Sequence, residues 1–164
     1  MKFANFAILG LYMKILLATD GGKHSQAAIT AIPMLNLADI TEVRIISVVD
    51  MSVPLAIDIY AGYLPSTAEI EAAARESAEN ILKDASQKIA QMFENRPEVK
   101  IVTEILTGSP ESAIVETAEQ MHADLIIVGS HSYSRWERLL LGSVSDSVVH
   151  HAPCSVLVVK SPKE

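Results

Sequence analysis

Five short runs of apolar, largely β-branched residues, separated by segments with helical periodicity, constrain the fold of this chain most strongly. The predicted strands cover residues 14–19, 42–49, 99–106, 124–129 and 155–159. Runs that are apolar on both faces are typical of strands covered by helices on each side of a sheet. Strands that alternate with helices, joined by right-handed crossovers, predict an α/β fold with an open, doubly wound parallel sheet.

The four predicted helices carry apolar residues at steps of three and four. They cover residues 23–37, 66–93, 109–121 and 143–151. Ser66 followed by Glu69 predicts a capping box at the start of the longest helix. Ser109, followed by proline, predicts a side-chain cap at the start of the third.

Length and charge limit the class of protein. A chain of 164 residues suits a single domain, and its net charge of −7 disfavours nonspecific binding to nucleic acid or to an anionic membrane. Cys154 is the only cysteine, so no intrachain disulfide forms, which suits a cytoplasmic protein. We expect Cys154 to be a packing residue.

Two segments have no clear place in the strand–helix pattern. Residues 1–12 form a predicted N-terminal extension that is too short to span a membrane, followed by a single predicted domain over residues 13–164. Residues 50–65 form a predicted irregular connection, and connections of that length are usually functional or mobile.

A ligand site is predicted where the sheet reverses its strand order. Open α/β sheets bind ligands beyond the carboxyl ends of their strands, at this switch point. The first predicted strand runs into Thr19, Asp20 and two glycines, and the fourth ends at Gly129. We expect these segments to face each other if the two strands are neighbours.

A second part of the predicted site is the start of the last helix, residues 142–145. Unpaired amides and a partial positive charge at a helix start favour phosphate groups. Ser143 and Ser145 add hydroxyl donors, and Arg135 and Arg138 add cations. Several such contacts would hold a di- or triphosphate with micromolar affinity, about −8 kcal/mol. The alternative is purely structural: Ser143 caps the helix, and Gly129 ends a strand.

Two stretches, "KILLATDGGKHSQAA" and "GSHSYSRWERLLLGSVSDSVVHHAPCSVLVVK", resemble the universal stress protein family, and the resemblance spans residues 13–160. It implies a five-stranded parallel sheet of order 3-2-1-4-5 with helices on both faces, in the class of adenine nucleotide alpha hydrolase-like folds. It also implies a homodimer paired through the last strand, residues 155–159.

One branch of that family binds ATP through glycines at fixed spacing. Gly129, Gly142 and Ser143 match this pattern, whereas Ser132 replaces its second glycine. A positive φ at that position would cost serine about 1–2 kcal/mol. Mg or Mn would enter only through the phosphates. The resemblance and the predicted crevice together assign these nucleotide-binding residues: Ala18, Thr19, Asp20, Val48, Val49, Val128, Gly129, Ser132, Arg135, Gly142, Ser143, Val144 and Ser145.

The sequence therefore predicts a stress-response regulatory protein that binds ATP, ADP or AMP and acts as a homodimer. It contains no strong catalytic constellation, so we expect at most slow ATP hydrolysis. One alternative is a nucleotide-free dimerisation scaffold of the same family, which Ser132 favours. Another is an adenylating or phosphate-transfer enzyme on a related scaffold, which fold alone cannot support.

Overall fold

The computed structural model describes residues 12–35, 39–50, 66–130 and 141–161. Nearly all of the predicted N-terminal extension and of the predicted long connection lies outside these ranges, namely residues 1–11 and 51–65. Among the described helices, none combines the length and apolar character needed to cross a bilayer.

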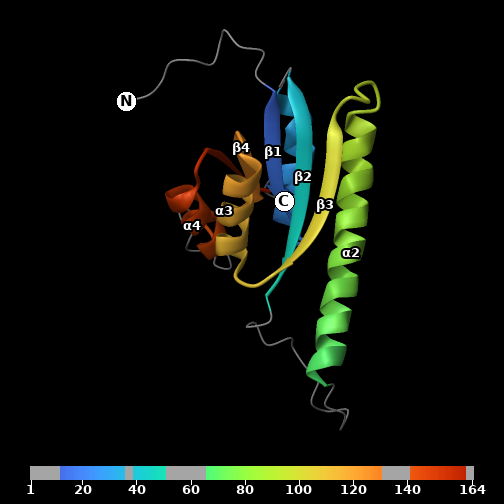
Figure 1. Ribbon diagram of the computed structural model, residues 1–164, viewed down its shortest axis with the longest axis vertical. Coiled ribbons are helices and arrows are strands. Elements are labelled where there is room, and N and C mark those ends of the chain that lie inside the picture. Colours follow the sequence, from blue (N-terminus) through green and yellow to red (C-terminus); the bar gives the residue numbers. More distant parts are fainter. Residues whose placement is uncertain (1–11, 36–38, 51–65, 131–140, 162–164) are drawn as a thin grey trace.

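The core of the protein is a parallel five-stranded sheet in the order β3-β2-β1-β4-β5. Figure 1 shows β4, β1, β2 and β3 following one another across the sheet. This order confirms the predicted fold class. The register pairs Leu16 of the central strand with Arg44 on one side and Ile126 on the other. The strands are β1 (Met13–Ala18), β2 (Ile40–Val49), β3 (Lys100–Thr107), β4 (Leu125–Gly129) and β5 (Ser155–Val159).

The predicted helices form, and only the first differs from its prediction by more than one residue at a boundary. They are α1 (Lys23–Ala31), α2 (Thr67–Met92), α3 (Pro110–Met121) and α4 (Ser143–His151). The first was predicted to run to residue 37, but the α-helix ends at Ala31 and a 3₁₀ turn, η1 (Ile32–Leu35), follows. Pro33 lies in this turn and has no N–H to donate to the carbonyl of Ile29, so the α-helical bonding stops there.

Helices cover both faces of the sheet and produce two cores. On one face, Ile29 of α1 and Ile89 of α2 pack against Leu17. On the other, Ile114 of α3 and Val148 of α4 pack in the cluster that contains Leu16. The neighbouring strand residues 16 and 17 face opposite cores, as the side-chain alternation of a strand requires. This explains why the strands are apolar throughout.

The switch point lies between β1 and β4. Leu17 pairs with Ile127, so the residues that follow the two strands emerge side by side at the carboxyl edge of the sheet. On one side of the β1–β4 pair the sheet continues through β2 to β3, and on the other side it continues to β5. The predicted juxtaposition of residues 19–20 with Gly129 is therefore confirmed.

Candidate functional site

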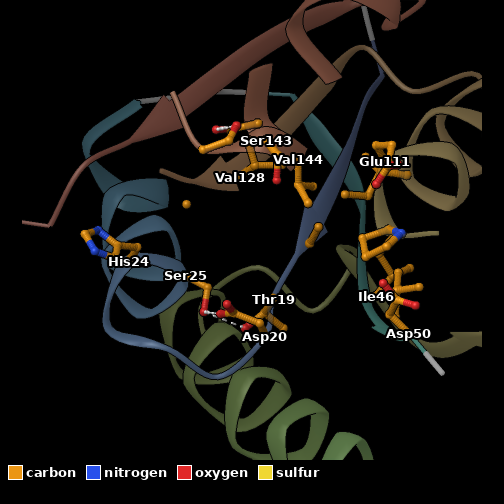
Figure 2. Close-up of a pocket in the computed structure, with 17 residues that line it drawn as sticks. Thr19, Asp20, His24, Ser25, Ile46, Asp50, Glu111, Val128, Ser143 and Val144 are labelled. Atoms are coloured by element: carbon orange, nitrogen blue, oxygen red, sulfur yellow. Dashed lines mark hydrogen bonds between the residues drawn. The ribbon is translucent and has the colours of Figure 1, made fainter. Parts of the chain in front are cut away.

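A pocket of about 620 Å³ opens at the carboxyl edge of the sheet, at the switch point (Figure 2). It lies beyond the ends of β1, β2 and β4 and is bordered by the first turns of α1, α3 and α4. Its volume is in the range typical of small-molecule sites, roughly 300–1,000 Å³. Ten of the predicted site residues line it: Ala18, Thr19, Asp20, Val48, Val128, Gly129, Gly142, Ser143, Val144 and Ser145.

Three predicted residues are not placed in the pocket. Val49 does not line it, because successive strand residues face opposite sides and its neighbours Val48 and Asp50 take the pocket side. Ser132 and Arg135 lie outside the described residues, as does Arg138.

The pocket also contains residues that the sequence analysis missed. Two of them, Ile46 and Asp50, could have been predicted from the sequence. Side chains alternate between the two faces of a strand, so residues 46 and 50 lie on the same face as Val48. The α3 residues required knowing that this helix begins beside β2, which no local pattern shows. The missed lining residues are His24, Ser25, Ile46, Asp50, Pro110, Glu111 and Ile114.

The turn after β1 is held by its own side chains. Oδ1 of Asp20 accepts hydrogen bonds from the Gly22 amide at 2.9 Å and from the Ser25 hydroxyl at 2.7 Å. The Gly21 amide donates to the Thr19 hydroxyl oxygen at 3.2 Å, and Gly21 adopts a φ of 76° that favours glycine. This network holds the Asp20 carboxylate at the pocket.

Gly129 is needed for the close approach of α1. A Cβ atom on this residue would lie 2.6 Å from the carbonyl carbon of His24 and from the amide nitrogen of Ser25. Both are backbone atoms, so no side-chain movement could relieve the contact. The glycine at the end of β4 therefore lets the first turn of α1 form a wall of the pocket.

The start of α4 presents backbone amides to the pocket. Its cap residue is Gly142, not Ser143, and the first intrahelical bond runs from the Asp146 amide to the Gly142 carbonyl at 2.8 Å. The amides of residues 143–145 precede that bond and have no intrahelical acceptor. The Ser145 hydroxyl, expected to donate outward, instead donates to the Gly142 carbonyl at 3.0 Å.

The three helices that begin at the pocket all lack a side-chain cap at their first turn. The cap residues of α1, α3 and α4 make no side-chain cap hydrogen bond, so the cap predicted for Ser109 does not form. In α2, which does not border the pocket, Ser66 and Glu69 form the predicted capping box. Three helix starts with partial positive charge thus converge on one cavity.

Carboxylates line the same pocket. Asp50 and Glu111 lie together on one side of it, and His24 lies on the opposite side (Figure 2). Among the described lining residues there is no lysine or arginine. The described part of the chain contains no group of three histidine, cysteine or acidic side chains placed to hold a metal ion.

Cys154 is partly buried against the core beneath α3 and α4. Burial, and secondarily the charge of Asp124, raise the pKa of its thiol. A neutral thiol among apolar side chains agrees with the predicted packing role.

A sequence model described as the universal stress protein family matches residues 11–160. The chain belongs to the universal stress protein family. A universal stress protein of Methanocaldococcus jannaschii is 41% identical over 158 residues, which cover 94% of this chain and 85% of that protein.

Solved structures of universal stress proteins share the fold. UspA from Lactobacillus plantarum superposes with a TM-score of 0.68 at 27% identity, covering 90% of this chain and 97% of that one. A universal stress protein in complex with cAMP gives 0.59 at 24% identity, covering 92% and 98%. A family member from Arabidopsis thaliana with AMP bound gives 0.57 at 18% identity, covering 92% of each.

Proposed function

We propose that this universal stress protein binds an adenine nucleotide, ATP or its ADP and AMP relatives, in the pocket at the carboxyl edge of the sheet. The observation that carries the proposal is the start of α4, which has no side-chain cap and borders a cavity of about 620 Å³. Unpaired amides at helix starts bind phosphate groups. The relatives that hold cAMP and AMP support the same ligand class.

Each region of the pocket suits one part of a nucleotide. The amides of residues 143–145 suit the phosphates, and Gly142 allows the close approach of the chain there. The Asp20 carboxylate, held by Gly22 and Ser25, suits the hydroxyl groups of the ribose. Val48 and the other apolar lining residues suit the flat faces of the base. A Mg or Mn ion would enter bound to the phosphates.

The proposal includes a homodimer that pairs through β5. This strand lies at one edge of the sheet, and its last four residues, 156–159, are apolar and only partly buried. An edge strand with free ladder groups is a template for pairing with another chain. Nucleotide occupancy would regulate this dimer during stress, in the cytoplasm, where a lone cysteine is suited to the reducing environment.

Titration calorimetry with Mg-ATP and with AMP tests the proposal. Ser143→Asp places a carboxylate at the first position of α4, where it favours the helix but repels phosphate. We expect it to weaken ATP binding at least tenfold, or about 1.4 kcal/mol, without lowering the melting temperature. Thr67→Asp, the same change at the first position of α2 away from the pocket, is the matched control.

The absence of binding heat and of thermal stabilisation at millimolar nucleotide would contradict the proposal. The chain would then be the nucleotide-free scaffold. Equal affinities for the wild type and Ser143→Asp would instead show that α4 does not hold the phosphates.

A further inference from the structure

The described wall of the pocket is electrically asymmetric. The unpaired amides at the start of α4 favour anions, whereas Asp50 at the end of β2 and Glu111 in the first turn of α3 bring negative charge to another part of the wall. Figure 2 shows these two acidic residues on one side of the cavity, flanking Ile46. A phosphate chain beside two carboxylates would be repelled. The proposed nucleotide therefore directs its base toward Asp50 and Glu111.

Glu111 is placed to contact that base. It is the second residue of α3, after Pro110, and its partly exposed side chain lines the pocket next to the apolar surface of Ile46, Val48 and Ile114. Within the described part of the chain, its carboxylate forms no hydrogen bond or ion pair. Its acceptor capacity is thus available at an apolar wall that suits a flat ring.

We propose that Glu111 is a specificity residue that accepts a hydrogen bond from the exocyclic amino group of the nucleobase. The inference rests on the proposed nucleotide site and deepens it. An ionised carboxylate is an acceptor only, so it pairs with an amino group and finds no partner on a base that lacks one. A base with a carbonyl oxygen at the same position would place two acceptors against each other. The site would therefore select aminopurines such as adenine.

A purely local role for Glu111 gives a different expectation. An acidic residue in the first turn of a helix stabilises the helix dipole whatever the pocket contains. Removing it would then lower the melting temperature slightly and leave the choice of base unchanged. Comparing two ligands that differ only in the amino group separates the two roles.

The experiment measures the affinities of ATP and of purine riboside triphosphate, which has the same sugar and phosphates but no amino group. We expect the wild type to prefer ATP by about tenfold, the effect of one charge-assisted hydrogen bond. In Glu111→Ala, ATP should bind about tenfold more weakly and the analogue about as before, so that the preference disappears. Glu116→Ala, an exposed change on the same helix that does not line the pocket, should keep the preference.

The outcomes distinguish this inference from the proposed function. If the wild type binds both ligands equally, or if Glu111→Ala keeps the preference, the role of Glu111 is overturned while nucleotide binding stands. If the wild type binds neither ligand, both proposals are overturned.

Discussion

A Cβ atom on Gly129 would lie 2.6 Å from the backbone carbonyl carbon of His24. The end of β4 and the first turn of α1 are therefore in contact through their main chains. Since both segments line the pocket, the spacing of the two backbones helps to set the shape of the site. The glycine that looks like part of a phosphate motif has a packing role of its own.

Gly129→Ala should destabilise the protein by about 1–3 kcal/mol, because a methyl group forced against backbone atoms displaces α1. It should also weaken nucleotide binding, since α1 forms one wall of the pocket. Urea denaturation and calorimetry measure the two effects. Gly22→Ala is the comparison: there the nearest atom is the Asp20 carboxylate oxygen at 3.1 Å, a longer contact and one with a side chain, so we expect a smaller loss of stability. Equal stability of Gly129→Ala and the wild type would refute the packing role.

His122→Gly should stabilise the protein. His122 caps the carboxyl end of α3 with a φ of 52°, a left-handed conformation that costs a residue with a Cβ atom about 1–2 kcal/mol. Its side chain is exposed, so little packing is lost. The greater conformational entropy of glycine in the unfolded chain offsets part of this strain relief. The free energy of unfolding should therefore rise by about 0.5–1 kcal/mol. The midpoint of urea unfolding measures it; His122→Ala, which keeps the Cβ atom, should show no such gain.

Cys154 should react slowly with iodoacetamide. Burial, and then the charge of Asp124, raise the pKa of its thiol, so less thiolate is present at any given pH than in an unfolded chain. The rate at pH 8 should rise sharply when urea unfolds the protein. The same shift makes the unfolded chain ionise first, so stability contributed by the neutral thiol falls as the pH rises above the ordinary thiol range. A native rate equal to that of a cysteine peptide would contradict this account.

The sequence predicts the helices and strands better than it predicts which residues line the pocket. The bounds of α4 and β5 agree with the prediction, and Ser66 with Glu69 forms the expected capping box, because apolar periodicity and caps are local signals. The strand ends and the start of α4 were accessible for the same reason. Glu111 was not, because its place in the pocket depends on how α3 packs beside β2.

Val49 and α1 show two further limits of local inference. Val49 was included with Val48 because the family resemblance puts the end of the second strand at the nucleotide, but strand alternation leaves Val49 out of the pocket lining. The apolar periodicity of residues 23–37 continues past Pro33, and the missing amide of that proline ends the α-helical bonding. In both cases backbone geometry decides the outcome.

The helix starts without side-chain caps have a practical consequence for measurement. Amides that no side chain satisfies bind whatever anion the solution offers, and inorganic sulfate or phosphate resembles the tail of a nucleotide. Buffer ions would therefore compete for the cavity. In phosphate buffer the nucleotide must displace a bound anion, so its apparent affinity is lower. In chloride-based buffers we expect a higher affinity for the nucleotide.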